Sequence, residues 1–171
     1  MSVSNWVVDP AHSYIEFTLH INGDVSRRVY FRKIASLLKL EESFENSELQ
    51  LQWVSDSVDS GDKGLDKFLT SADFFAADKV PTLKFTSEKI SKLSETQFGI
   101  RGTLNYGHHD EPISFNTRFE NNLINQEDGR KRTGLYMSTQ VEPGMFGIKN
   151  REIRFDKSIG IEVELEFLEK V

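Results

Sequence analysis

The 171-residue sequence contains no cysteine, which excludes disulfides, thiolate nucleophiles and cysteine-ligated metals. It also has no apolar run long enough to span a bilayer, and Met1–Trp6 lacks the basic and apolar stretches of a signal peptide. As written, the chain is expected in the cytoplasm, whereas a chain that had lost an export signal would be periplasmic. No linker-like change in composition and no internal repeat is present, so we expect a single domain over residues 1–171.

Recognisable catalytic motifs are absent as well. The sequence has no Gly-x-Ser-x-Gly elbow, no HExxH spacing and no glycine-rich run before a helix. The carboxylates in Ile161–Phe167 alternate with apolar residues, which is typical of a solvated strand face rather than of an acid and base pair. We therefore expect a non-enzymatic protein with no catalytic residue and no cofactor.

Metal binding is not favoured by the histidine positions. His108 and His109 are adjacent, and we place them between a strand that ends near Tyr106 and one that starts near Ile113. Neighbouring side chains diverge at such a hairpin, whereas a zinc site needs several ligands that converge on one ion. We expect no metal site.

Charge and hydrophobicity are those of a soluble protein with a core. The formal net charge is -6, 37% of the residues are hydrophobic and 28% are charged. Because nucleic-acid-binding modules usually have a basic face, a nucleic-acid partner is not expected. We interpret the basic run Arg130–Arg132 as a solvated turn.

Alternation of apolar and polar residues dominates the chain. In residues 15–21, Ile15, Phe17, Leu19 and Ile21 are separated by polar residues, which predicts a strand with one buried face. The same rhythm occurs in residues 49–53, 83–86, 98–100, 113–119 and 161–167. Such strands pair antiparallel. The only helical pattern lies in residues 61–71, so about eight strands must bury their apolar faces by forming a barrel or a sandwich.

Phenylalanine is the predominant aromatic residue, with 13 Phe against 2 Trp and 4 Tyr. Many of these residues fall on the inward side of the strand pattern. An apolar interior of this kind is either a packed core or the lining of a cavity, and composition does not separate the two. A barrel of about eight strands is wide enough for either arrangement.

Four blocks of sequence resemble, in order, the YceI-like family of lipocalin-like barrels. They are the opening Trp6–His20 with its Asp-Pro-Ala-His-Ser turn; Ser57–Phe75 running on to Val80–Ser87; Gly102–Leu104 with Pro112–Ile113; and Phe146–Ile148. The resemblance implies an all-β fold, an extended eight-stranded antiparallel barrel with one short helix. It also implies that the interior binds a long-chain amphiphilic lipid, such as a polyprenyl chain, an isoprenoid quinone or a fatty-chain compound, for transport, storage or stress protection.

On this basis we expect the lipid tail to lie along the barrel axis. The inward residues expected to line it are Phe17, Leu19, Phe85, Phe98, Ile100, Phe115, Phe119 and Phe167. By resemblance, His12, Ser13 and Asp73 are candidates for orienting a head group, although hydrogen bonding to a loop backbone is an equal alternative for each.

The sequence departs from the family pattern at three places. Val29 and Ser36 stand where the family commonly has glycine, and the histidine expected before Gly107 follows it as His108, so no family role is carried over to His108.

Two other functions are alternatives to lipid binding. One is a hydrolase or isomerase that pairs His12 or His20 with a carboxylate at the cavity mouth. The other is a protein-interaction module with a filled core. A homodimer is compatible with the sequence.

Overall fold

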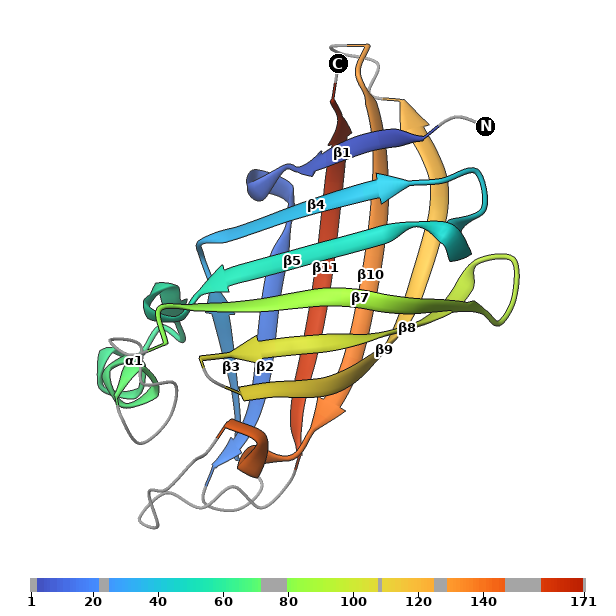
Figure 1. The fold of residues 1–171 in the computed structure, drawn as a ribbon. Helices are drawn as coiled ribbons and strands as arrows, with labels where there is room; N and C mark the ends of the chain where they lie inside the picture. Colours follow the sequence, from blue (N-terminus) through green and yellow to red (C-terminus); the bar gives the residue numbers. More distant parts are fainter. Residues whose placement is uncertain are drawn as a thin grey trace.

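The computed structural model describes residues 3–21, 25–71, 80–107, 109–124, 129–146 and 158–170. These residues form one antiparallel sheet with short helical segments at its corners (Figure 1). The strands are β1 (Ser4–Val8), β2 (Tyr14–Ile21), β3 (Val25–Phe31), β4 (Ile34–Leu40), β5 (Glu48–Val54), β6 (Val58–Asp59), β7 (Thr82–Lys92), β8 (Gln97–Tyr106), β9 (His109–Ile124), β10 (Lys131–Val141) and β11 (Ile159–Glu169). The helical segments are α1 (Lys63–Thr70) and the 3-10 turns η1 (Pro10–His12), η2 (Phe44–Asn46), η3 (Ser55–Ser57) and η4 (Pro143–Phe146).

The sheet closes into a barrel through the first strand. Strand β1 pairs with β4 on one side and with β11 on the other, which completes the ring β1-β4-β5-β7-β8-β9-β10-β11. The eight-stranded antiparallel barrel predicted from the sequence is thus confirmed. Strands β2, β3 and β6 extend the sheet from the edge of β11 that also pairs with β1. Alternation in residues 15–21 predicted β2 but neither β3 nor β6.

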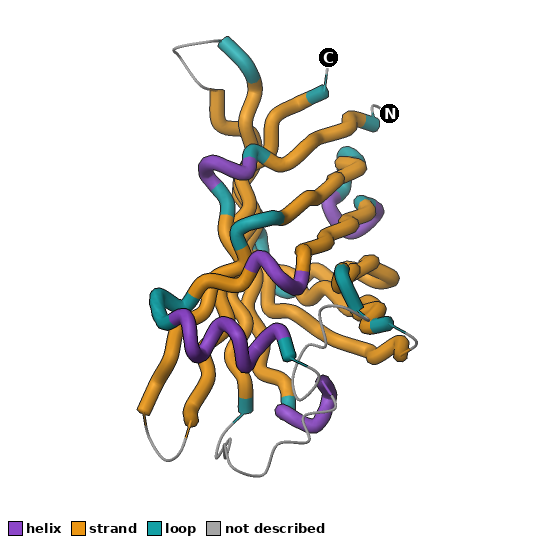
Figure 2. The backbone as a smooth tube through the Cα atoms, turned by 90° about the vertical axis from the view of Figure 1, so that its left-hand side faces the viewer, coloured by secondary structure: helices purple, strands orange, loops and turns teal. Residues whose placement is uncertain are grey.

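One edge of β11 serves two strands. Its end pairs with β1, with Glu169 opposite Trp6, and its beginning pairs with β2, with Glu164 opposite Tyr14. The turn η1 separates the two. In Figure 1, β1, β4, β5 and β7 run across the view while β2, β10 and β11 run along it; Figure 2 shows the same two directions from the side.

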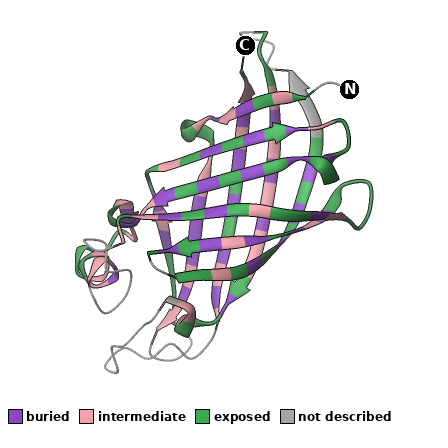
Figure 3. Ribbon diagram, in the orientation of Figure 1, coloured by how far each residue is buried: buried purple, intermediate pink, exposed green. Residues whose placement is uncertain are grey.

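Burial alternates along the strands as the sequence pattern predicts. In β5, Leu49, Leu51 and Trp53 are buried whereas Gln50 and Gln52 are exposed. Figure 3 shows this alternation along β4, β5 and β7. Because successive strand residues point to opposite faces, the buried set forms one apolar cluster inside the barrel.

Aromatic rings fill much of the described interior. At one end, Phe44 of η2 stacks on Phe119 with ring centroids 4.1 Å apart and meets Phe98 edge-on at 4.8 Å. In the middle, the rings of Phe85 and Phe115 are 5.1 Å apart. Edge-to-face and stacked pairs of this kind stabilise beyond the area they bury, so the interior is held by specific ring contacts.

The helix covers part of the opposite end. Asp62 caps α1 because its Oδ1 accepts hydrogen bonds from the backbone N–H groups of Gly64 and Leu65. Leu69 is fully buried, and Leu65 and Phe68 pack against the core cluster. The helix expected over residues 61–71 is therefore present, beside the end of β5 (Figures 1 and 2). Among the described segments, none is a helix long and apolar enough to cross a membrane.

The β8–β9 hairpin is tighter than the sequence predicted. Strand β9 begins at His109, which pairs with Tyr106, rather than near Ile113. Gly107 between them has φ 64°, a conformation that glycine adopts without strain. His109, Asp110 and Glu111 are all polar, so alternation does not predict a strand there. They join β9 because they pair with β8 across the turn. His108 lies outside the described residues.

Candidate functional site

All eight residues expected to line a ligand lie together inside the barrel. Each is at most 8% exposed, and all belong to the same buried cluster. They are Phe17, Leu19, Phe85, Phe98, Ile100, Phe115, Phe119 and Phe167. The structure thus gathers them around one interior, and their contact with a ligand stays a prediction.

Further aromatic residues share this interior and were not selected from the sequence, among them Phe31, Trp53 and Phe44. Phe17 meets Phe31 at 5.1 Å and Trp53 at 6.1 Å, and Phe44 belongs to the ring cluster at the other end. Trp53 follows the alternation of its strand, so its inward direction was available from the sequence. Phe44 lies in a 3-10 turn, where no strand rhythm indicates direction.

Two buried polar atoms inside the barrel lack a hydrogen-bond partner within the described part of the chain. They are Nε1 of Trp53 and Oγ1 of Thr117. Other buried hydroxyls are satisfied: Ser36 Oγ donates to the Gln50 carbonyl at 2.6 Å, and Thr133 Oγ1 donates to the Glu120 carbonyl at 3.2 Å. An unsatisfied buried polar group costs free energy, so each of the two requires an explanation.

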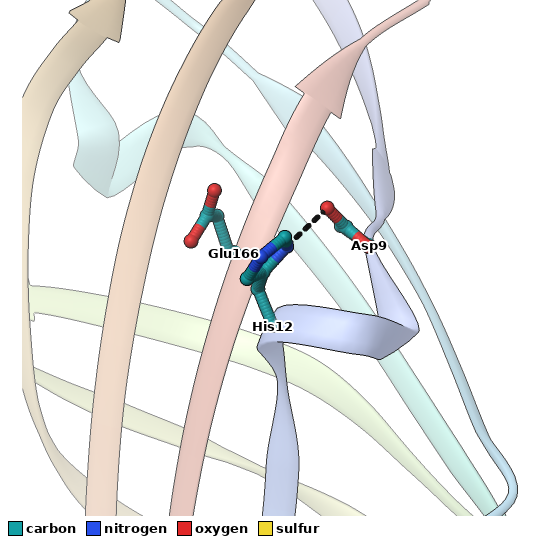
Figure 4. Close-up of side chains that lie close together, drawn as sticks. All are labelled: Asp9, His12 and Glu166. Carbon is teal, nitrogen blue, oxygen red and sulfur yellow. Dashed lines mark hydrogen bonds and ion pairs between the residues drawn. The ribbon is translucent and has the colours of Figure 1, made fainter. Parts of the chain in front are cut away.

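A separate polar cluster forms at the corner between β1 and β2. Asp9 caps η1 by accepting a hydrogen bond from the Ala11 N–H at 3.1 Å. Its other oxygen, Oδ2, lies 2.7 Å from Nδ1 of His12. Figure 4 shows this pair with Glu166 of β11 beside it. The Asp-Pro-Ala-His-Ser turn therefore places an imidazole and a carboxylate beside the carboxylate of Glu166 on the outer surface.

Arg132 joins the two carboxylates of this cluster. Its Nη1 is 2.9 Å from Asp9 Oδ2 and 2.9 Å from Glu166 Oε1. The side chain is only 14% exposed, so the interpretation of Arg130–Arg132 as a solvated turn is wrong for its last residue. The cause is strand pairing, since Arg132 belongs to β10 and lies opposite Leu168.

The contacts in this cluster lower the pKa of Asp9 and raise the pKa of His12. The hydrogen bond from His12, with further bonds from Arg132 and the Ala11 N–H, lowers the pKa of Asp9 below its ordinary value of 3.8 against an opposing effect of burial. The hydrogen bond to Asp9, followed by the charges of Asp9 and Glu166, raises the pKa of His12 above 6.5. Each group thus stabilises the charged form of the other.

Ser13 replaces a strand hydrogen bond at the same corner. Its Oγ accepts from the Glu166 N–H at 2.9 Å, and the Asp9 N–H donates to the Glu166 carbonyl at 2.7 Å. These bonds bridge the interval between β1 and β2 along β11. His12 and Ser13 therefore lie in a corner that fastens the barrel, and their head-group role stays a prediction. Asp73 lies outside the described residues.

The corner cluster contains side chains that could bind a cation, but Arg132 already balances the charge of its carboxylates. Ligand atoms of Asp9, His12 and Glu166 all lie within 4.8 Å of one another. Arg132, however, donates to both carboxylates, so a metal would have to displace a partly buried guanidinium. The arrangement is best explained as an ion-pair network that joins β1, β10 and β11.

A shallow hollow of about 180 Å³ adjoins this cluster on the outer face of β9–β11. It is lined by His12, Arg118, Glu120, Gly134, Leu135, Tyr136, Glu164, Leu165 and Glu166. The rival enzyme hypothesis required a His–carboxylate pair at the cavity mouth. His12 and Asp9 do form such a pair, but on the outer surface, where His12 has 59% of its side chain exposed.

Solved structures of the same fold come from several bacteria. Burkholderia cenocepacia BcnA has a TM-score of 0.81 at 17% identity over 93% of this chain and 98% of its own. The YceI protein of Campylobacter jejuni has a TM-score of 0.74 at 20% identity over 84% and 85%. A polyisoprenoid-binding domain from Saccharophagus degradans, implicated in plant cell wall breakdown, has 0.70 at 10% over 99% and 100%.

The TM-scores of these structures establish a common fold. A search of curated protein sequences found no match. The family model described as the YceI-like domain matches residues 6–168, from the first strand of the barrel to the last. The chain therefore belongs to the YceI-like family.

Proposed function

We propose that this protein binds one long-chain amphiphilic lipid, of the isoprenoid or fatty-chain type, inside its barrel. The observation that carries the proposal is the closed barrel of a YceI-like chain whose inner face is apolar along its length and rich in phenylalanine. Burial of an apolar tail contributes roughly 25 cal/mol per Å² removed from water, less the cost of ordering the tail. The apolar inner face therefore suits the hydrocarbon tail of the lipid, and a polar head group needs a separate partner.

The ring contacts set a condition on binding. Phe85 touches Phe115, and Phe44 bridges Phe98 and Phe119, so a bound chain must pass between rings that rotate aside. Phenylalanine suits this, because it has no hydrogen bond to break when it turns. The filled-core alternative differs here, since it predicts rings that stay in contact and no lipid uptake.

An isoprenoid is the favoured ligand class. The Saccharophagus degradans domain with the same fold is named for polyisoprenoid binding, and the family match extends over almost the whole chain. Binding alone, without chemistry, suits this interior, because its described buried residues include a single carboxylate, Glu16, which alternates onto the outer face of β2. Transport, storage and stress protection all use this same binding step. A single binding domain without a nucleic-acid partner stays our prediction.

Native mass spectrometry tests the proposal. The protein purified from its own host is expected to show a mass above that of the polypeptide, and solvent extraction should release a lipid identifiable by tandem mass spectrometry. If the protein shows only the polypeptide mass and takes up neither added isoprenoid quinone nor polyprenyl lipid, the proposal is wrong and the filled-core alternative is correct.

A further inference from the structure

Trp53 has a buried hydrogen-bond donor with no acceptor. The residue is 2% exposed, and its Nε1 makes no hydrogen bond within the described part of the chain. An indole N–H can only donate, so no rearrangement of its own hydrogen satisfies it. A buried donor without an acceptor is costly in an apolar surrounding, so this position favours a bound group that supplies an acceptor.

The second tryptophan shows what the first one lacks. Trp6 is equally buried at 2%, but its Nε1 donates to Ser4 Oγ at 2.8 Å. Both indoles belong to the same apolar cluster. The difference is therefore a property of the position of Trp53 and not of buried tryptophans in this protein.

Aromatic rings surround the unsatisfied donor. The ring of Trp53 is 6.1 Å from Phe17 at an interplanar angle of 72° and 6.0 Å from Phe31 at 53°. Phe17 and Phe31 are themselves 5.1 Å apart. Three rings inclined to one another suit a flat ligand group, which contacts them through its face and edge.

The described residues around Trp53 favour an uncharged acceptor. None of the buried residues in the described ranges is lysine or arginine, and the buried carboxylate Glu16 faces Arg28 on the outer side. A phosphate or carboxylate head placed beside Trp53 would lose its hydration without a compensating cation. A carbonyl oxygen gains a hydrogen bond there at much lower cost.

We propose that the indole N–H of Trp53 donates a hydrogen bond to a carbonyl oxygen on a flat, uncharged head group, as in an isoprenoid quinone. This inference rests on the proposed lipid-binding function. The head then lies at the end of the barrel beside η3 and α1, and the tail extends toward Phe98 and Phe119. Tyr106 of β8 lies level with Trp53, because Leu83 pairs with both residues. Phe98 is eight residues away along β8, roughly 26 Å at 3.3 Å per residue.

Binding of matched probes to Trp53→Phe tests the assignment. The probes are a ubiquinone with a short isoprenoid tail and squalene, a hydrocarbon with no acceptor. Wild type should bind the ubiquinone about tenfold more tightly than Trp53→Phe does, and both proteins should bind squalene alike. Trp6→Phe makes the same chemical change at a satisfied indole and should leave the preference for ubiquinone intact.

A second measurement needs no variant. With ¹⁵N-labelled tryptophan, the indole N–H resonance of Trp53 should move downfield on saturation with the ubiquinone while that of Trp6 stays in place. Squalene should move neither resonance downfield.

The outcomes separate the two proposals. If wild type binds neither probe, the lipid-binding function is wrong and the Trp53 assignment falls with it. If wild type binds both probes but Trp53→Phe binds the ubiquinone as tightly and the Trp53 resonance is unmoved, only the assignment is wrong. Loss of ubiquinone binding in Thr117→Val but not in Trp53→Phe would also overturn it, because the head would then lie at the other end. If wild type bound geranylgeranyl diphosphate more tightly than the ubiquinone, the assignment of an uncharged head group would be wrong.

Discussion

Nη1 of Arg132 lies 2.9 Å from Oδ2 of Asp9, although the two residues are 123 positions apart in the chain. The contact joins β10 to the corner between β1 and β2, and Glu166 of β11 shares the same guanidinium. This corner is where β11 passes from pairing with β2 to pairing with β1, and the β1–β11 pairing closes the ring. The ion pairs therefore fasten the barrel where its ladder of backbone hydrogen bonds is interrupted.

Replacing Arg132 with glutamine should destabilise the barrel by about 2 kcal/mol, because two carboxylates lose a partly buried charged donor. Urea unfolding followed by circular dichroism measures the change. Lys92→Gln is the matched control, since its ion pair with Glu95 is exposed and should contribute less than about 0.5 kcal/mol. Equal effects of the two variants would show that the Arg132 network does not fasten the barrel.

The contribution of His12 to stability should depend on pH in one direction. Because folding raises its pKa above 6.5, the stabilisation is complete below pH 6.5 and is lost as pH rises through the higher folded value. The pKa of Asp9 is lowered from 3.8, so its own contribution is present above that pH and is lost on acidification. The free-energy difference between wild type and His12→Gln should thus be larger at pH 5 than at pH 8.5. A difference that grows with pH would contradict the pairing.

Gly102 should not tolerate a side chain. A Cβ atom there would lie 2.8 Å from two ring carbons of Phe85 and would collide with the Thr86 carbonyl oxygen, which belongs to the backbone and cannot turn away. Gly102→Ala should therefore cost about 2 kcal/mol in the free energy of unfolding.

Gly99 is the matched control on the same strand. A Cβ atom at Gly99 meets nothing within 4 Å, so Gly99→Ala should be neutral or should stabilise by about 0.5 kcal/mol. Thermal unfolding of both variants checks the pair of predictions. Similar melting temperatures would mean that β7 and β8 separate enough to admit a methyl group at Gly102.

Phe85→Trp should reduce lipid uptake while the barrel stays folded. Phe85 is fully buried against Phe115, so a larger ring occupies space that a ligand needs. Uptake is measured by native mass spectrometry after incubation with lipid, and folding by circular dichroism. Tyr136→Trp enlarges an aromatic residue on the outer face and should leave uptake unchanged. Unchanged uptake in Phe85→Trp would remove Phe85 from the ligand lining.

The alternation of residues along the chain was enough to predict an antiparallel barrel and most of its inner face. Phe17, Phe85 and Phe115 are inward because side chains in a strand change face at every residue, which is a local property. The same rule applied to Trp53. The helix was also local, since its apolar residues repeat with helical spacing and Asp62 caps it.

Which strands close the barrel, and which distant side chains meet at the closure, was decided by the tertiary structure alone. The local sequence predicts that Arg132 lies in a solvated basic turn. In the fold it is a partly buried partner of Asp9, because the pairing of β10 with β11 brings it to the β1–β2 corner. The indoles of Trp6 and Trp53 are both buried, yet one finds Ser4 and the other finds no acceptor within the described residues. Such outcomes depend on non-local register, which no short-range pattern of residues encodes.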